Sequence, residues 1–341
     1  MKAIVVSCAI GIAVSVAQAE TGNAQDHFYA GKKITIVAFG GAGNNYDTYS
    51  RMLSRHLGKH IPGNPGFVVV NMPGAGGLTA ANYVSRVAPQ DGTVMHVVSD
   101  GLLMFEATGR PGLQDSLGNF RWLAALSSSN MVTATWHKSG IRTIDDAKAR
   151  DVRLGGSGAG AMSSVVPTLY NTFAGTKFVI VQGYKSAPEQ HLAMDRGEID
   201  GRGAASWTSF KNLLGKEIEE GKLHGLAQIG LKREADLPNT PLMTELAQGN
   251  ARNLAIATFV SKALIVSRSV IVSPGTPPDR VDILRKALAA VVHDPGWLNE
   301  VEKFKLDSGF VPGAEIEANV KDVLATPKDV IAAAQAAMKL P

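Results

Sequence analysis

The chain has 341 residues, of which 45% are apolar and 19% are charged; this composition is typical of a soluble globular protein and excludes a disordered array. Its formal net charge is +4, but the lysines and arginines are scattered among acids, so we expect no nucleic-acid partner. The length suffices for a large core and predicts two domains.

The amino terminus predicts a cleavable export signal. Lys2 precedes an apolar run over residues 3–17, and small residues stand at the −3 and −1 positions, Ala17 and Ala19. The run is shorter than the roughly 20 apolar residues that a membrane-spanning helix needs. We therefore expect residues 1–19 to be removed and the mature protein to begin at Glu20, in the periplasm.

The one cysteine of the chain, Cys8, lies inside this predicted signal. The mature protein is therefore expected to contain no disulfide, which a chain with this much core does not require. A lipoprotein anchored through Cys8 is the weaker alternative, because the apolar run continues beyond it.

Strand and helix patterns alternate along most of the chain. The first series comprises strand 34–39, helix 45–57, strand 67–72, helix 76–87 and strands 94–99 and 120–126. The second series comprises strands 131–136 and 152–156, helix 164–173, strand 178–183, helix 187–196 and strands 200–205 and 224–230. A helical pattern at 241–247, an apolar stretch at 263–272 and helices beginning at Pro295 and Pro327 follow.

This alternation implies parallel strands joined by crossover helices. The fold class is therefore α/β, with two Rossmann-like lobes and a hinge between them. We place lobe 1 at residues 20–131 and 231–341 and lobe 2 at residues 132–230, with the chain crossing near residues 126–132 and again near residue 230.

Four strands run directly into glycine- and hydroxyl-rich turns, at residues 40–47, 73–77, 155–164 and 183–188. In an α/β sheet such turns lie at the carboxyl ends of the strands, so four helix amino termini can converge on one crevice. Free N–H groups and the positive end of the helix dipole favour an anion there. The pattern predicts a site for a carboxylate.

The first turn, at residues 40–47, differs from a dinucleotide-binding loop. Tyr46 stands where the third glycine of that fingerprint is required, so the spacing argues against a nucleotide cofactor. Asn44, Asn45 or Asp47 can cap the following helix, while the glycines let a ligand approach backbone amides. A purely structural turn is the alternative.

The turn at residues 155–164 invites comparison with the nucleophile elbow of hydrolases. Ala159 stands where the last glycine of that motif is required, and no Asp and His in suitable order accompany Ser157. We favour a hydroxyl-lined anion loop and keep a secreted α/β hydrolase using Ser157 as the alternative.

His56 and His60 have the spacing of a metal-binding pair. The glutamate of the H-E-x-x-H motif is missing, and Gly58 between them is expected to end the helix. We therefore predict surface histidines and neither a metal nor a cofactor.

Three ordered segments, at residues 45–77, 87–93 and 192–202, resemble the substrate-binding proteins of tripartite tricarboxylate transporters, also called the Bug family. The segment at 87–93 reads Val-Ala-Pro-Gln-Asp-Gly-Thr, and the third contains Gly-Glu-Ile-Asp-Gly-Arg. The resemblance extends from about residue 32 to about residue 337.

This resemblance implies a periplasmic-binding-protein fold of type II, in which a small carboxylate is clamped between two lobes. It further implies a monomeric receptor without enzymatic activity, which delivers a di- or tricarboxylate or an aromatic acid to two membrane permease subunits. A ligand-sensing partner of a membrane signalling protein is an alternative that shares the fold. The predicted ligand-binding residues are Phe39, Gly40, Gly43, Asn44, Asn45, Asp47, Ala75, Ser157, Gly158, Ser163, Ser164, Gly183, Tyr184, Ala204 and Ala205.

Overall fold

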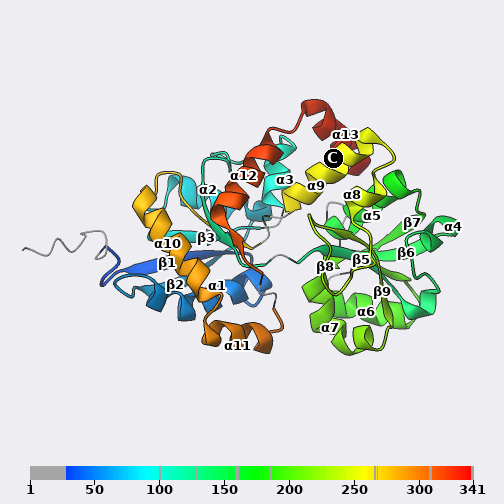
Figure 1. Cartoon of the computed structure of the whole chain (residues 1–341), viewed down its shortest axis with the longest axis horizontal. Helices are drawn as coiled ribbons and strands as arrows, with labels where there is room; N and C mark the ends of the chain where they lie inside the picture. The colour runs from blue at the N-terminus through cyan, green and yellow to red at the C-terminus, as the bar shows by residue number, and fades with distance from the viewer. Residues whose placement is uncertain are drawn as a thin grey trace, which may run out of the picture.

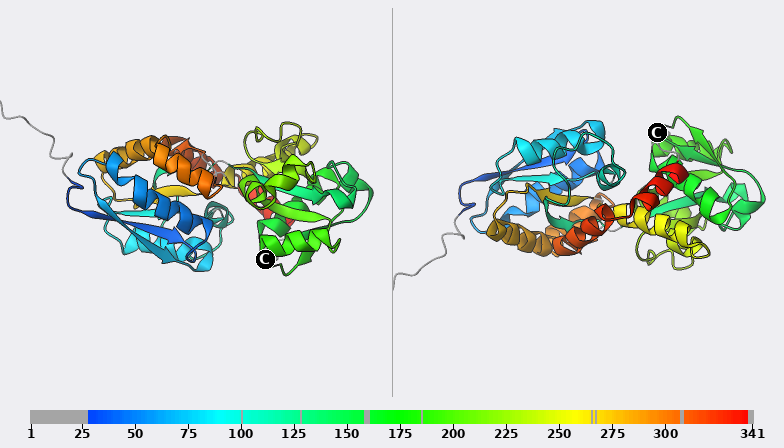
Figure 2. Two further views of the ribbon diagram at one scale, coloured as in Figure 1. Left: turned by 90° about the horizontal axis from the view of Figure 1, so that it is seen from below. Right: turned by 90° about the horizontal axis from the view of Figure 1, so that it is seen from above.

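Two β-sheets, each covered by helices, form the two lobes of the protein. The computed structural model describes residues 28–338 except 100, 128, 158–160, 185, 265, 267, 307 and 308. The lobes lie side by side and meet at a narrow waist (Figures 1 and 2). This is the two-lobed α/β architecture that the sequence predicts; the predicted signal, with Cys8 and Glu20, lies outside the described residues.

Lobe 1 contains a six-stranded sheet of order β11-β4-β10-β3-β1-β2. Its strands are β1 (Lys33–Phe39), β2 (Gly66–Met72), β3 (Val94–Val97), β4 (Arg121–Ala125), β10 (Ser269–Val272) and β11 (Val311–Pro312). Its helices are α1 (Asn45–His56), α2 (Leu78–Arg86), α3 (Leu102–Ala107), α10 (Pro278–Val291), α11 (Pro295–Lys303) and α12 (Gly313–Leu324), with short 3₁₀ turns η1 (Gly58–His60) and η2 (Ala75–Gly77).

Lobe 2 contains a five-stranded sheet of order β7-β6-β8-β5-β9. Its strands are β5 (Met131–Trp136), β6 (Val152–Gly156), β7 (Phe178–Gln182), β8 (Gly201–Ser206) and β9 (Leu223–Ile229). Its helices are α4 (Asp146–Ala149), α5 (Met162–Ala174), α6 (Ala187–Asp195), α7 (Trp207–Glu219) and α8 (Met243–Leu246), with the 3₁₀ turn η3 (His137–Ser139). Two further helices, α9 (Ala251–Leu264) and α13 (Lys328–Met338), lie between the lobes.

Strand β1 occupies the interior of the first sheet, where it is parallel to both β2 and β3. Its apolar side chains therefore pack on both faces of the sheet. Ile34 and Ile36 pack against α1 and α10 on one face, and Val37 packs against α2 and α3 on the other. A strand buried on both faces is expected to be nearly continuously apolar, as this one is.

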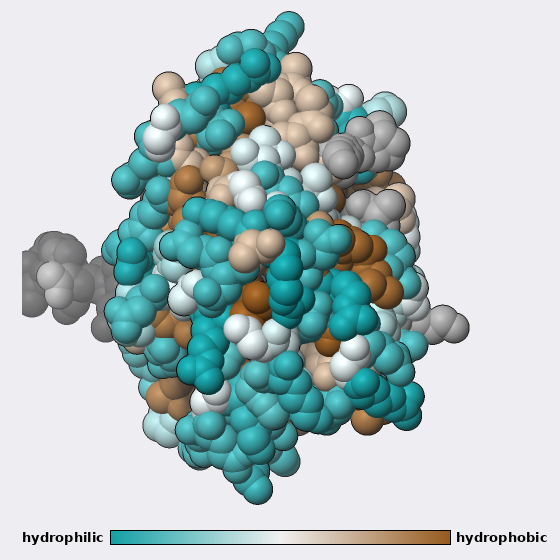
Figure 3. All heavy atoms as spheres, turned by 90° about the vertical axis from the view of Figure 1, so that its right-hand side faces the viewer, coloured by the Kyte–Doolittle hydropathy of each residue, from teal (hydrophilic) through white to brown (hydrophobic). Residues whose placement is uncertain are grey.

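The second sheet is covered by α5 on one face and by α6 and α7 on the other. Trp207 and Phe210 at the start of α7 pack under the sheet with Trp136 and Met194. The end of lobe 2 that points away from lobe 1 is mainly hydrophilic with separate apolar patches (Figure 3). Val179 and Leu192 are among the exposed apolar side chains of this lobe.

Helices α9 and α13 connect the two lobes. Helix α9 packs against α3 and α12 of lobe 1 and against α8 of lobe 2, and α13 packs against both α9 and α5. One apolar core consequently continues from lobe 1 through Phe259 and Val260 of α9 to Leu169 of α5. The domain boundaries near residues 131 and 230 stay a prediction.

His96 in β3 gives lobe 1 a built-in sensitivity to acid. Its side chain is fully buried, and Nδ1 lies 2.8 Å from the carbonyl oxygen of Val37, to which it donates. Burial lowers the pKa of His96 to about 4, and the hydrogen bond to Val37 only partly opposes this. Between this value and the unfolded-state pKa of about 6.5, the unfolded chain binds more protons than the folded one.

We therefore expect the contribution of His96 to stability to be complete above pH 6.5 and to be lost as the pH falls toward 4. By linkage, the loss between pH 7.5 and pH 4.5 amounts to about 2–3 kcal/mol. Urea unfolding of the wild type and of His96→Gln across this range measures it, because the other titrating groups are common to both proteins. Parallel pH profiles of the two proteins contradict the prediction.

Candidate functional site

The carboxyl ends of the parallel strands in both lobes face the space between the lobes. In lobe 1, β1, β2 and β3 end at this edge, and β10, which is antiparallel to β3, begins there. In lobe 2, β6, β7 and β8 end at the opposing edge, and β5, which is antiparallel to β8, begins there. The topology thus brings the predicted turns of both lobes to one cleft, where ligands of open α/β sheets bind.

The first turn of lobe 1 is held together by its own polar groups. The Asn44 side chain caps α1, since its Oδ1 accepts from the Asp47 amide at 2.8 Å and its Nδ2 donates to the Phe39 carbonyl at 3.2 Å. The Phe39 ring packs edge-on to Tyr46 at 5.1 Å between ring centroids. Gly40 has a φ of 83°, a conformation that favours glycine.

Asp47 is almost completely buried and is directed into the turn. Its Oδ2 accepts from the Gly43 amide at 2.8 Å and pairs with Arg51 Nε at 2.9 Å. Burial alone would raise the pKa of Asp47, but these hydrogen bonds outweigh it and hold the pKa below its usual value. The carboxylate therefore stays ionised and stabilises the turn, while Asn45 is the exposed side chain at this helix end.

Ala75 lies in the turn that follows β2, where the backbone has a φ of 45° at Ala75 and 66° at Gly76. The hydroxyl of Ser99, beyond the end of β3, donates to the Gly76 carbonyl at 2.6 Å and fixes this turn against the neighbouring strand. Ala75 is thus placed at the same edge of lobe 1 as the first turn.

In lobe 2, the turn after β6 has paired hydroxyl groups. The hydroxyls of Ser157 and Ser163 lie 3.1 Å apart, and the Ser157 amide donates to Ser163 Oγ at 3.1 Å. Ser164 contacts the amide group of Gln182 in β7 at 3.1–3.2 Å, so its hydroxyl ties α5 to the sheet. Gly158 lies outside the described residues.

The turn after β7 places an exposed glycine beside a partly buried tyrosine. Gly183 has a φ of 105° and open space around its Cα. Burial, and then the charges of Glu198 and Glu189, raises the pKa of Tyr184, so its hydroxyl stays protonated as a donor. Ala204 and Ala205 lie at the end of β8, with Ala204 buried and Ala205 half-buried.

Two of the predicted residues line a cavity of about 210 Å³ between the lobes, which we call the serine–arginine cavity. Asn45 comes from lobe 1 and Ala205 from lobe 2. The complete described lining is Asn45, Ser129, Met131, Ala205, Ser206, Ser209, Leu264 and Arg268. It therefore combines residues of both lobes with residues of the segments that join them.

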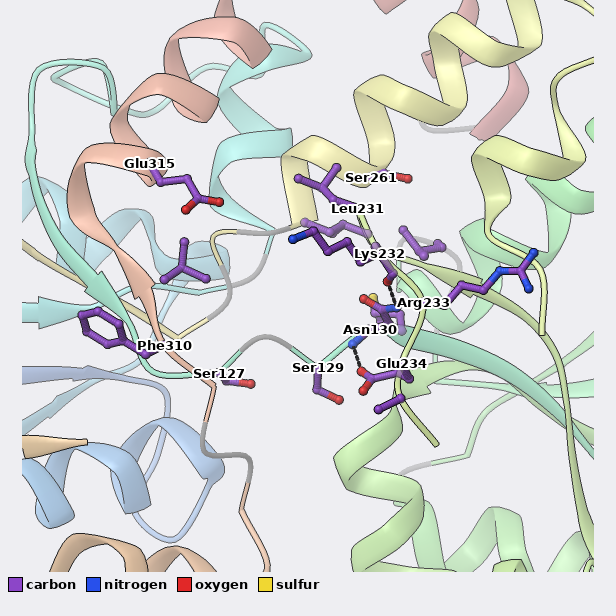
Figure 4. Close-up of a pocket in the computed structure, with 16 residues that line it drawn as sticks. Ser127, Ser129, Asn130, Leu231, Lys232, Arg233, Glu234, Ser261, Phe310 and Glu315 are labelled. Atoms are coloured by element: carbon purple, nitrogen blue, oxygen red, sulfur yellow. Dashed lines mark hydrogen bonds between the residues drawn. The ribbon is translucent and has the colours of Figure 1, made fainter. Parts of the chain in front are cut away.

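A larger cavity of about 390 Å³ lies beside it, and the two share Ser129, Met131 and Leu264 (Figure 4). Its walls carry charges of both signs, including Lys232 and Glu315, and none of the predicted ligand-binding residues.

Polar groups of this larger cavity also bind one another. Glu234 Oε1 accepts from the Asn130 amide at 2.5 Å, and Asn130 Nδ2 donates to the Lys232 carbonyl at 2.7 Å. Arg233 pairs with Glu245 at 2.8 Å. Because these contacts hold the joining segments together and the charges are mixed, we place the candidate site in the smaller serine–arginine cavity instead.

The sequence analysis missed the other six lining residues of the serine–arginine cavity, of which four are polar: Ser129, Ser206, Ser209 and Arg268. Ser206, the last residue of β8, caps α7 by accepting from the Ser209 amide at 3.2 Å, and the sequence signal for this helix start is a serine at the N-cap position. The signal for Arg268 is a lone charge inside the apolar stretch 263–272.

The two histidines with metal-like spacing lie on the other side of α1, beside α11. His60 Nε2 is 3.2 Å from Asp294 Oδ2, and His56 Nε2 is 3.3 Å from Glu300 Oε1. Within the described part of the chain, no three His, Cys, Asp or Glu side chains are grouped where they could hold a metal ion. None of the helices described here combines the length and apolar character needed to cross a membrane.

The surroundings of Ser157 differ from those of a catalytic serine. An activated serine requires a hydrogen-bonded general base, usually an oriented histidine. Among the described residues, the recorded partner of the Ser157 hydroxyl is another hydroxyl, that of Ser163.

Together, the fold and the cleft define a two-lobed solute-binding protein. A TctC solute-binding protein from Polaromonas has a similar fold, with a TM-score of 0.68 and 21% identity over 89% of this chain and 99% of that one. Two proteins of Rhodopseudomonas palustris also have a similar fold. The structure of Rpa4515 with adipate gives a TM-score of 0.61 and 18% identity, covering 91% of this chain and 98% of that one. The structure of MatC with bound malate gives a TM-score of 0.59 and 17% identity, covering 88% of this chain and 99% of that one.

The chain belongs to the tripartite tricarboxylate transporter receptor family, whose profile matches residues 51–335. The resemblance seen in the sequence is therefore confirmed. Members of this family are substrate-binding proteins, so the chain is a receptor and not an enzyme, and the hydrolase alternative is wrong.

The packing of β8 against α5 positions the Ser163 turn, and it leaves no room for a side chain at Gly203. A methyl group there would overlap the carbonyl oxygen of Ser163. We expect Gly203→Ala to push the first turn of α5 away from the sheet and to lower the free energy of unfolding by about 1–3 kcal/mol.

The matched control is Gly215→Ala in α7, where the added methyl group meets no other atom within 4 Å. Alanine favours a helix by about 1 kcal/mol over glycine, so this variant is expected to keep or raise the stability. Denaturant unfolding of both variants measures the difference, and equal midpoints refute the packing argument.

Proposed function

We propose that this protein captures a small carboxylate in the serine–arginine cavity and delivers it to a tripartite tricarboxylate-type membrane transporter. The observation that carries the proposal is the composition of that cavity. Its described lining has three serine hydroxyls, one asparagine and one arginine, and it has no acidic side chain. It also lies at the amino-terminal ends of α1 and α7, which favour negative charge.

The chemistry of two relatives supports a dicarboxylate. The Rhodopseudomonas palustris proteins of similar fold hold adipate and malate, both of which are small dicarboxylates. We include tricarboxylates and aromatic acids in the proposed ligand class, because backbone amides and hydroxyls recognise the carboxylate group rather than the remainder of the ligand.

The other predicted residues extend the proposed binding surface along the cleft. In the second sheet β6 is the neighbour of β8, β7 lies on the far side of β6, and adjacent strands are about 4.8 Å apart. Along this edge, the turn with Ser157 and Ser163 is therefore about 5 Å from the end of β8, and the turn with Gly183 and Tyr184 is about 10 Å from it. A ligand with a second carboxylate would reach toward them from the serine–arginine cavity.

The proposed mechanism is closure of the two lobes around the ligand. A ligand that contacts both Asn45 of lobe 1 and Ser206 of lobe 2 has more contacts in the closed form, so it shifts the open–closed equilibrium toward that form. Two membrane permease subunits would then recognise the closed receptor. In the alternative function, as a ligand-sensing protein, the receptor would bind its ligand in the same way, but its membrane partner would be a signalling protein instead of a transporter.

We propose further that the receptor works as a monomer in the periplasm, after removal of the signal at residues 1–19. The support for export and processing is the Ala17-Gln18-Ala19 sequence after a short apolar run.

Carboxylates are expected to stabilise the protein selectively. A ligand at one hundred times its dissociation constant adds about 2.7 kcal/mol to the free energy of unfolding. Thermal unfolding with succinate, malate, adipate, citrate and benzoate, compared with glucose, putrescine and the uncharged isostere adipamide, measures the effect. Stabilisation by the sugar or the polyamine, without any by a carboxylate, would refute the proposed ligand class.

Export is expected to yield a mature protein that starts at Glu20. The intact mass of protein recovered from the periplasmic fraction tests this directly. A mass that includes residues 1–19, or a lipid attached to an amino-terminal Cys8, overturns the predicted processing.

A further inference from the structure

Arg268 carries the only formal charge among the described residues that line the serine–arginine cavity. It is 8% exposed, so its guanidinium is largely removed from bulk water. A cation in such surroundings interacts with an anion more strongly than an exposed one does.

The backbone at Arg268 is held in an uncommon conformation. Its φ is 53°, in the left-handed region that residues other than glycine, asparagine and aspartate rarely occupy. Its carbonyl oxygen accepts from the amide of Leu126, at 3.4 Å, where the segment leading from β4 toward lobe 2 begins. Backbone strain of this kind persists where the surrounding structure fixes it, and it clusters at ligand sites.

The guanidinium is positioned beside the amino-terminal end of α1. Its central carbon lies 5.8 Å from the ring centroid of Tyr46, which is within the range of a cation–π interaction. Tyr46 follows Asn45 directly, so the arginine and the exposed asparagine meet at the same helix end. The planar guanidinium fork matches the two oxygens of a carboxylate.

Hydroxyl groups line the same cavity. Ser129 Oγ accepts from the Thr208 amide at 3.1 Å, and Ser206 Oγ accepts from the Ser209 amide at 3.2 Å. A hydroxyl that accepts from a backbone amide keeps its own proton to donate elsewhere. Both serines therefore have a proton to donate to an anion in the cavity.

We propose that Arg268 is the side-chain anchor for one carboxylate group of the ligand and determines its selectivity for anions. This inference rests on the proposed function and adds a fixed cation to it. The carboxylate pairs with the Arg268 guanidinium and accepts from the hydroxyls of Ser129 and Ser206, which line the same cavity. Asn45 lies beside the same group at the end of α1.

Calorimetric titration of succinate, malate and adipate into the wild type and Arg268→Asn tests the proposal. Asparagine tolerates a positive φ, so this variant keeps the backbone conformation while removing the cation. Loss of a charge-assisted hydrogen bond is expected to weaken binding of the best of these probes by roughly 10- to 100-fold. Arg268→Lys keeps the positive charge but lacks the planar guanidinium, so its affinity is expected to lie between those of the wild type and Arg268→Asn.

Arg252→Asn is the matched control, because it removes the same charge from an exposed position on α9. Its affinity is expected to stay within about twofold of the wild type, since exposed charges are screened by water and salt. Denaturant unfolding of each variant shows whether a change in affinity comes from loss of the fold. If Arg268→Asn does not fold, the affinity of Arg268→Lys tests the proposal, and weaker binding than in the wild type supports it.

The outcomes separate this inference from the proposed function. A wild type that binds none of the three probes, nor any other carboxylate, overturns both. A wild type that binds a carboxylate while folded Arg268→Asn or Arg268→Lys binds it equally well overturns the role of Arg268 alone. Weakened binding in the Arg268 variants and unchanged binding in Arg252→Asn support it.

Discussion

The site depends on two places where the chain crosses between the lobes and lies against itself. The first crossing leaves β4 at Leu126, the second enters β10 at Arg268, and a backbone hydrogen bond of 3.4 Å joins them. This contact holds the start of β10 beside the carboxyl end of β4. The edges of both sheets are therefore kept face to face, with Ser129 and Arg268 between them. These crossings therefore bring helix termini of both lobes to the same cleft.

Much of the polar chemistry in the cleft maintains the turns themselves. Asn44 and Asp47 are engaged in capping α1 and closing its turn, and Ser164 is engaged with Gln182. The burial of Asp47 beside Arg51 keeps a negative charge within the turn rather than facing the cleft. The polar side chains that line the serine–arginine cavity are fewer: three serines, Asn45 and one arginine.

The strands and most helices could be predicted from the sequence because hydrophobic periodicity and turn residues report local structure. The predicted strand over residues 34–39 corresponds to β1, the predicted helix over 45–57 to α1, and α11 begins at Pro295 as predicted. Helix α9 was not predicted, because it is apolar on several sides where it contacts both lobes. Ser206 and Arg268 could not be placed from the sequence, because the cavity that they line forms between segments more than 60 residues apart. Asn45 and Ala205 could be placed because their turns follow parallel strands.

The end of the chain adds a third attachment between the lobes. Helix α12 packs on β4 of lobe 1, whereas α13 packs on α5 of lobe 2, and Ala325, Thr326 and Pro327 alone separate the two helices. The connection between the lobes at this end of the chain is therefore three residues long, and Pro327 within it has a restricted φ. Because the α12–α13 connection is short and separate from the other two crossings, we expect it to limit the rotation of one lobe relative to the other. Helix α13 packs on α5, and α5 begins at the Ser163 turn, so this connection also links lobe 1 to the helix that carries that turn.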